Sequence, residues 1–231
     1  MLPPSKLLWA AEVPRAALTV MALLRSREML GDVPRGDGRP ILLLPGLFNS
    51  DRSNVVLRRY LNRLGYRAEG WGLGRNLGIR AVGPDADKLF DRIRALHADT
   101  GEPVTLIGIS LGGIMARFAA QRLPGLVREV ITVSSPFAGS PRATNVWRAF
   151  ELFTGERVDS DHVAAQGREA AAPLNVRSTA IWSQSDGLVN GRICRGTGDP
   201  RARDIEIRSG HLGVQLNPLA LRAIAGVLAE A

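Results

Sequence analysis

The fold is decided by the stretch Val104-Thr-Leu-Ile-Gly-Ile-Ser110-Leu-Gly-Gly-Ile-Met-Ala-Arg-Phe118. Its first half is β-branched and aliphatic, which favours a buried strand, and its second half repeats apolar residues at helical spacing. The Gly108-x-Ser110-x-Gly112 pattern between them predicts a sharp strand-to-helix turn that holds a serine in a strained backbone conformation. Side chains at residues 108 and 112 would collide with the neighbouring chain, so both positions require glycine. The following helix directs its free N–H groups toward the serine, where an oxyanion could be held.

The length and composition of the chain are typical of one soluble domain, which we expect to span residues 1–231. A chain of this length can bury one sizeable core, and 45% of its residues are apolar. All but two of its 30 basic residues are arginines, and these are spread over the whole chain to give a net charge of +8. Because there is no long run of like charges and no alternation of basic with aromatic residues, we expect no nucleic-acid partner.

The N-terminal region, residues 5–30, predicts a helical segment rather than a targeting signal. Its longest clean apolar run, Ala16 to Leu24, is too short to span a bilayer. Charged residues follow this run where a signal peptide would have a small-residue cleavage site. The single cysteine, Cys194, cannot form an intrachain disulfide. These features favour a cytoplasmic over a secreted protein.

Within this segment the pattern predicts two short helices that are separated at Pro14. We expect Leu18, Met21 and Leu24 to face the body of the protein. A basic amphipathic helix can also lie at a membrane surface, so a peripheral membrane contact remains an open alternative.

Six short apolar runs alternate with helical patterns along the rest of the chain. They lie near residues 41, 67, 104, 130, 178 and 205. This alternation predicts an α/β fold with a mostly parallel six-stranded sheet and helices on both faces. The glycine-rich stretch 72–78 has the spacing G-x-G-x-x-x-G and no helix directly behind it, so it predicts a loop rather than a dinucleotide site.

Residues from about 137 to 173 interrupt the alternation and predict a small helical cap over the site. Trp147, Phe150 and Phe153 give this segment an apolar face. Together with Phe48, which follows the first strand, they are our candidate substrate-binding residues. An ordinary packing helix is the alternative interpretation.

Serine is a weak nucleophile that needs a base, and the positions of the three histidines relative to the sheet distinguish the candidates. Functional groups of an open parallel sheet lie on loops beyond the carboxyl ends of its strands. His211 follows the last strand, whereas His97 lies within a predicted helix and His162 within the predicted cap. His211 is therefore the predicted base for Ser110.

The base in turn needs a carboxylate that orients it. Asp186 leaves the strand before the last one in a Ser-Asp-Gly turn. Asp199 and Asp204 are rivals, but both lie at the amino-terminal end of the final strand, on the opposite edge of the sheet. We therefore predict a catalytic triad of Ser110, Asp186 and His211.

An acyl-transfer site also needs two N–H donors for the oxyanion. One is expected from the backbone of Leu111, directly after the nucleophile. The other is expected from the loop after the first strand, with Leu47 favoured over Phe48.

This set of motifs resembles the α/β-hydrolase family, in particular its small bacterial esterase and lipase-like members. The resemblance rests on five motifs: Leu43-Leu-Pro-Gly-Leu47, Gly108-Ile-Ser-Leu-Gly-Gly113, Val133-Ser-Ser-Pro136, Ser185-Asp-Gly-Leu-Val189 and Gly210-His211. It implies hydrolysis of small-molecule or lipid carboxylic esters through an acyl-serine intermediate, with no metal and no organic cofactor.

The chain departs from this family at two places. Family members often have His-Gly where this chain has Pro45-Gly46, which changes what supports the loop. The usual N-terminal antiparallel strands are replaced by predicted helices. Because a fold does not fix a reaction, an acyltransferase or thioesterase with the same triad and a non-catalytic binding protein of this fold remain alternatives.

Overall fold

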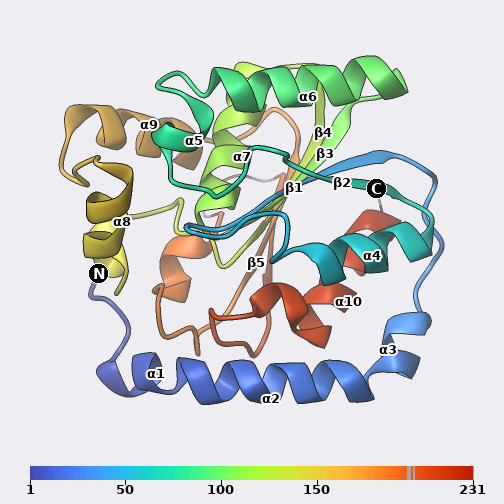
Figure 1. Ribbon diagram of the computed structural model, residues 1–231, viewed down its shortest axis with the longest axis horizontal. Coiled ribbons are helices and arrows are strands. Elements are labelled where there is room, and N and C mark those ends of the chain that lie inside the picture. Colours follow the sequence, from blue (N-terminus) through green and yellow to red (C-terminus); the bar gives the residue numbers. More distant parts are fainter. Residues whose placement is uncertain (197–198, 200, 231) are drawn as a thin grey trace.

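Six strands form one sheet in the order β2-β1-β3-β4-β5-β6, and every neighbouring pair is parallel (Figure 1). The computed structural model describes residues 1–196, 199 and 201–230. The strands are β1 (Pro40–Leu44), β2 (Arg67–Gly70), β3 (Val104–Ile109), β4 (Val127–Val133), β5 (Arg177–Trp182) and β6 (Ala202–Glu206). The predicted fold class, a mostly parallel six-stranded α/β sheet, is confirmed.

The central strands are apolar because helices cover both of their faces. Every residue of β1 and of β3 is buried, as expected for strands of a parallel sheet. The register aligns Leu44 of β1 with Gly108 of β3, so the loops that follow these two strands leave the sheet side by side. This alignment brings the segment after β1 close to Ser110.

Helices flank the sheet on both sides (Figure 1). One side carries α6 (Asp87–Thr100) and α7 (Leu111–Arg122), whose apolar residues pack on Leu42, Leu106 and Val130. The other side carries α4 (Val55–Leu64) and α10 (Pro218–Ala229), which pack on Leu43, Ile107 and Ile131. Successive residues of one strand thus point to opposite cores.

The remaining helical elements lie in connecting segments and at the N-terminal end. These are α1 (Lys6–Ala10), α2 (Glu12–Arg25), α3 (Arg27–Gly31), α5 (Ile79–Val82), η1 (Pro141–Ala143), α8 (Trp147–Thr154), α9 (Asp161–Ala171), η2 (Gly191–Cys194) and η3 (Val214–Leu216). Helices α8 and α9 fall within the segment 137–173. No helix of the described residues is both long and apolar enough to cross a membrane.

Helices α1 to α3 run along one side of the molecule, outside the layer of α4 and α10 (Figure 1). The break that we expected at Pro14 is wrong, because α1 ends at Ala10 and α2 continues through Pro14. Proline is tolerated there because the first turn of a helix leaves its N–H groups unbonded in any case.

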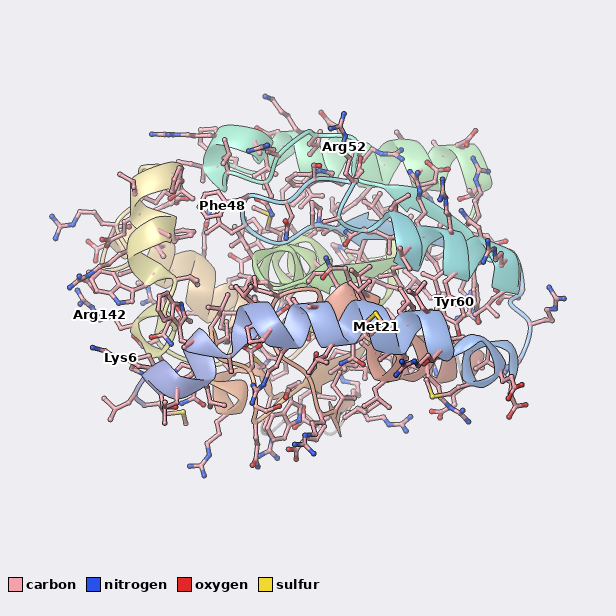
Figure 2. All side chains as sticks on the ribbon, turned by 60° about the horizontal axis from the view of Figure 1, so that its bottom comes forward. Lys6, Met21, Phe48, Arg52, Tyr60 and Arg142 are labelled. Carbon is pink, nitrogen blue, oxygen red and sulfur yellow. The ribbon has the colours of Figure 1, made fainter. Side chains whose placement is uncertain are left out.

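The expected orientation of α2 is also wrong. Leu18, Met21 and Leu24 are 68%, 48% and 65% exposed, and Figure 2 shows Met21 on the outward side of the helix. The inward face instead carries Glu12, which is 2% exposed, and Leu23, which packs on the core. A buried glutamate at the start of this face reversed the orientation that the apolar pattern predicted.

Candidate active site

The turn between β3 and α7 has the geometry that the Gly-x-Ser-x-Gly pattern predicts. Ser110 has φ 52° and ψ −120°, a conformation that non-glycine residues rarely adopt. Its N–H donates to the carbonyl of Val133 at 2.8 Å, which anchors the strained residue to the neighbouring strand.

Three glycines make room for this turn. A Cβ atom on Gly108 would lie 2.4 Å from the carbonyl oxygen of Gly112, and one on Gly112 would lie 2.3 Å from that of Leu44. The predicted requirement for glycine at both positions is confirmed. A Cβ on Gly113 would lie 2.0 Å from Oγ of Ser135, so this position needs glycine as well.

The structure brings Ser110, His211 and Asp186 together from three separate loops. Nε2 of His211 lies 3.1 Å from Oγ of Ser110, and Nδ1 lies 2.7 Å from Oδ2 of Asp186. The three residues follow β3, β6 and β5, respectively, at the carboxyl edge of the sheet. Asp199 and Asp204 instead precede or lie within β6, and Asp204 accepts a bond from the N–H of Gly196.

Asp186 is held in one orientation by the backbone of its own loop. Its Oδ1 accepts hydrogen bonds from the N–H groups of Leu188 at 2.9 Å and Val189 at 2.8 Å. The side chain is 1% exposed. With Oδ1 occupied by two donors, Oδ2 is left for the imidazole of His211.

Charge and burial act in opposite directions on the pKa of His211. Burial disfavours the imidazolium, but the charge and hydrogen bond of Asp186 and the charge of Glu12 outweigh it and raise the pKa of His211 above its ordinary value. A raised pKa makes the ring a stronger base toward a serine hydroxyl.

A pair of serines links the loops that carry Asp186 and His211. Oγ of Ser183 donates to the carbonyl of Ser209 at 2.8 Å and accepts from its N–H at 3.1 Å. Both residues are buried. Sequence reasoning missed this link, since serines in loops are common and nothing in their spacing pairs these two.

The predicted oxyanion donors, Leu47 and Leu111, line the same cavity as Ser110. The N–H of Leu111 is the first of α7 and has no partner within the helix. The alternative donor, Phe48, is engaged, because its N–H donates to the carbonyl of Asn76 at 2.9 Å.

Asn76 supports the loop after β1, where this chain has Pro45-Gly46 in place of the His-Gly of many family members. It is fully buried, and its side-chain amide donates to the carbonyl of Pro45 at 2.7 Å. Its backbone N–H donates to the carbonyl of Asn49 at 2.8 Å. The sequence gives no signal for this role, because the residue lies in a glycine-rich stretch that predicts only a loop.

A cavity of about 680 Å³ opens beside Ser110 and is lined mainly by apolar side chains. Two of our four substrate-binding candidates, Trp147 and Phe150 of α8, line it. The other two, Phe48 and Phe153, are not among its lining residues, which corrects that prediction. Their rings pack edge-to-face against each other with centroids 4.4 Å apart.

Several cavity-lining residues were not predicted from the sequence. They come from three helices: Ile79 and Val82 of α5, Met115 and Phe118 of α7, and Val163 of α9. Helix α5 has four residues, too few for a helical pattern to be detected. Within the described part of the chain, no group of three or more His, Cys, Asp and Glu residues is arranged to hold a metal ion.

Comparison with protein-family models finds no match. Over 116 residues the chain is 33% identical to a triacylglycerol lipase of Pseudomonas fragi, a region that covers 48% of this chain and 39% of that protein. The chain thus spans well under two thirds of that relative's length.

Solved structures share the architecture at low sequence identity. The lipase BlEst2 of Bacillus licheniformis, in its mature form, is similar with a TM-score of 0.62 and 18% identity, covering 86% of this chain and 95% of that one. The thioesterase domain from the curacin biosynthetic pathway gives a TM-score of 0.58 and 14% identity, with coverages of 85% and 93%. The parallel sheet, the turn at Ser110 and these similarities show that the chain has the α/β-hydrolase fold.

Proposed function

We propose that the protein is a serine hydrolase that cleaves carboxylic esters with a hydrophobic acyl group through an acyl-serine intermediate. The observation that carries this proposal is the hydrogen-bonded series from Asp186 through His211 to Ser110, next to an apolar cavity. The similarity to a lipase of Pseudomonas fragi supports a lipid or other small-molecule ester as substrate.

In the first half of the reaction, Oγ of Ser110 attacks the ester carbonyl carbon while Nε2 of His211 takes the hydroxyl proton. Asp186 keeps the other ring nitrogen protonated and stabilises the imidazolium. The N–H groups of Leu47 and Leu111 hold the oxyanion of the tetrahedral intermediate. The intermediate collapses when the C–O bond to the alcohol breaks and His211 returns the proton to the leaving oxygen.

In the second half, His211 deprotonates a water molecule that attacks the acyl carbon. Collapse of the second intermediate breaks the bond to Ser110, which regains its proton from the imidazolium. The carboxylic acid then leaves. The apolar lining of the cavity favours an acyl chain over a charged acyl group, because a charge there would lose its hydration.

The segment 137–173 acts as a cap in this proposal. Trp147 and Phe150 of α8 line the cavity, and α9 is held against α7 by Arg117. Nε of Arg117 donates to the carbonyl of Ala170 at 2.5 Å, and Nη2 donates to that of Ala172 at 2.9 Å. The cap therefore forms one wall of the acyl site.

A peripheral contact with an anionic lipid surface is part of the proposal. Nine of the thirteen exposed large apolar side chains of the described residues lie within residues 1–24. Exposed Lys6 lies among these residues and exposed Arg25 directly follows them, whereas Glu12 is buried. Such a segment can enter the headgroup region of a bilayer.

Sedimentation with anionic phosphatidylglycerol vesicles tests the lipid contact. The double variant Leu18→Gln, Leu24→Gln should lose vesicle binding, whereas the matched variant Leu219→Gln, exposed on another helix, should keep it. Equal binding of all three proteins would refute the contact.

A thioesterase is the second candidate, favoured by the similarity to the curacin thioesterase domain. The same triad attacks a thioester carbonyl, and when the C–S bond breaks the thiol leaves with the proton from His211, in place of the alcohol. An acyltransferase would use the same acyl-serine with an alcohol in place of water.

Hydrolysis of p-nitrophenyl esters of increasing acyl length, measured beside matched acyl thioesters, tests the proposed function. We expect turnover that rises from acetyl to longer chains and disappears in Ser110→Ala. A folded protein that cleaves none of these substrates would contradict the proposal, and a preference for thioesters would favour the second candidate.

A further inference from the structure

The carboxylate of Glu12 joins the N-terminal helices to the two loops that carry Asp186 and His211. Its Oε1 accepts from the N–H of Gly187 at 2.6 Å. Its Oε2 accepts from the N–H groups of His211 and Leu212, each at 2.8 Å. One buried side chain therefore binds the backbone directly after Asp186 and the backbone of His211 itself.

Glycines in the two loops allow α1 and α2 to pack closely against them. A Cβ atom on Gly187 would lie 2.3 Å from the carbonyl oxygen of Leu8, and one on Gly210 would lie 2.9 Å from Oε2 of Glu12. A side chain at residue 187 would therefore push the backbone of α1 away from the loops, and one at residue 210 would displace the Glu12 carboxylate. Glycine at both places lets the carboxylate reach the backbone.

Other bonds from the N-terminal segment end on the same two loops or next to them. Nη1 of Arg15 donates to the carbonyl of Ser185 at 2.6 Å. The side-chain amide of Asn145 donates both to Pro4, at 3.1 Å, and to Gly187, at 2.8 Å. The segment is thus bonded to the residues on both sides of Asp186.

A carboxylate removed from water is costly unless donors satisfy it, and here three backbone N–H groups do so. An apolar residue at position 12 would avoid the desolvation of a carboxylate, but it would leave these three N–H groups without their acceptor. What the charge does uniquely is bind two loops at once and place a negative charge near the imidazole.

We propose that Glu12 is a positioning residue for the triad: it fixes the distance between the loops of Asp186 and His211 and stabilises the imidazolium that forms during acyl transfer. This inference rests on the proposed function. It adds a residue from the N-terminal helices, 98 positions before Ser110 in the chain, to the machinery at the sheet edge.

The charged and titratable groups around His211 come from three elements. Asp186 lies at 2.7 Å on the loop after β5, and Glu12 binds the backbone from α2. Arg15, also on α2, is bonded to the carbonyl of Ser185, and Cys194 of η2 is buried near Asp186. Loss of the Glu12 charge therefore removes one of two anions that favour the protonated ring.

Histidine titration by NMR in Glu12→Gln tests the inference without depending on catalysis. The chain has three histidines, so the ring signals of His97 and His162 serve as internal controls. We expect the pKa of His211 to fall in Glu12→Gln and to move less in Glu12→Asp, which keeps the charge. The pKa values of His97 and His162 should not change.

Kinetics on the same proteins provide the second readout. We expect kcat of Glu12→Gln to fall on the order of 10- to 100-fold with KM changed less than about 3-fold, because displaced reacting groups slow the chemical step rather than binding. The acid limb of the pH–rate profile should move to lower pH, in step with the histidine titration.

Two glutamate variants control for structural effects. Glu28→Gln removes an exposed carboxylate from the same helical segment. Glu129→Gln removes a buried carboxylate that pairs with Arg39 at 3.3 Å, on a strand far from the triad loops. Both should keep the wild-type His211 titration and kcat of the folded protein.

The outcomes separate this inference from the proposed function. A wild-type protein with no esterase or thioesterase activity would refute the proposed function, while the histidine titration would still report on the Glu12 contact. An active wild type whose His211 titration and kcat are unchanged in Glu12→Gln would overturn the inference. If Glu12→Gln does not fold, Glu12→Asp decides through kcat, because its carboxylate oxygens are withdrawn by one methylene and no longer reach both loops: a wild-type kcat in that variant would overturn the inference.

Discussion

Replacing Asp186 by asparagine should abolish the proposed ester hydrolysis by changing the tautomer of His211. In the wild type, Oδ1 accepts two backbone N–H bonds, from Leu188 and Val189, and Oδ2 faces Nδ1 of His211. Both backbone partners are donors, so an asparagine must keep its oxygen toward them. Its NH₂ group then points at Nδ1, which can no longer be protonated and becomes an acceptor.

The imidazole of this variant carries its proton on Nε2, the atom that lies 3.1 Å from Oγ of Ser110. A protonated Nε2 cannot accept the serine proton. Loss of the correct tautomer in a serine triad costs on the order of 10⁴-fold in kcat, which corresponds to about 5.4 kcal/mol of activation free energy.

The assay is kcat/KM for a p-nitrophenyl ester, with thermal denaturation to verify folding. The matched control is Asp199→Asn, which alters another buried aspartate bonded to a backbone N–H, at the opposite end of β6. That control should stay within about 3-fold of the wild type. A folded Asp186→Asn protein with more than a tenth of wild-type activity would refute the reasoning.

The acid limb of kcat/KM should lie above the ordinary pKa of a histidine, since the rate needs the neutral ring and is lost as pH falls through the raised pKa of His211. An acid limb at or below the ordinary histidine pKa would contradict this. Arg117→Met should lower the free energy of unfolding by about 2 kcal/mol and Tm by about 4–8 °C, because the carbonyls of Ala170 and Ala172 lose their donors. An unchanged Tm, measured by calorimetry, would refute the role of Arg117 in holding the cap. Gly112→Ala should abolish activity and lower the free energy of unfolding by more than about 3 kcal/mol, because its methyl group would lie 2.3 Å from the carbonyl oxygen of Leu44. A soluble, active variant would contradict the geometry of the turn between β3 and α7.

The sequence predicted the parts of the molecule that follow from repeating patterns and sheet geometry. Alternation of apolar runs with helical patterns was enough for the parallel sheet. The rule that functional groups follow strand ends chose His211 over His97 and His162, and Asp186 over its rivals. Each of these inferences uses information within a few residues of the motif.

The features that were missed depend on contacts between distant segments. The orientation of α2 is set by Glu12, whose burial requires donors 175 to 200 residues away in the chain. An apolar pattern alone places such a glutamate outside. Similarly, Phe48 was grouped with the cap aromatics by residue type, but its ring contacts Phe153 rather than the cavity. The hydrogen bond from the side chain of Asn76 to the carbonyl of Pro45 could not be predicted either, because the two residues lie far apart in the sequence.

The central claim is that Ser110, His211 and Asp186 act as one unit. The most direct test is mass spectrometry of the protein after reaction with a fluorophosphonate probe. We predict a single adduct on Ser110 that forms rapidly in the wild type and at least about 10³-fold more slowly in His211→Ala. An adduct on another residue, or labelling of His211→Ala at the wild-type rate, would contradict the account.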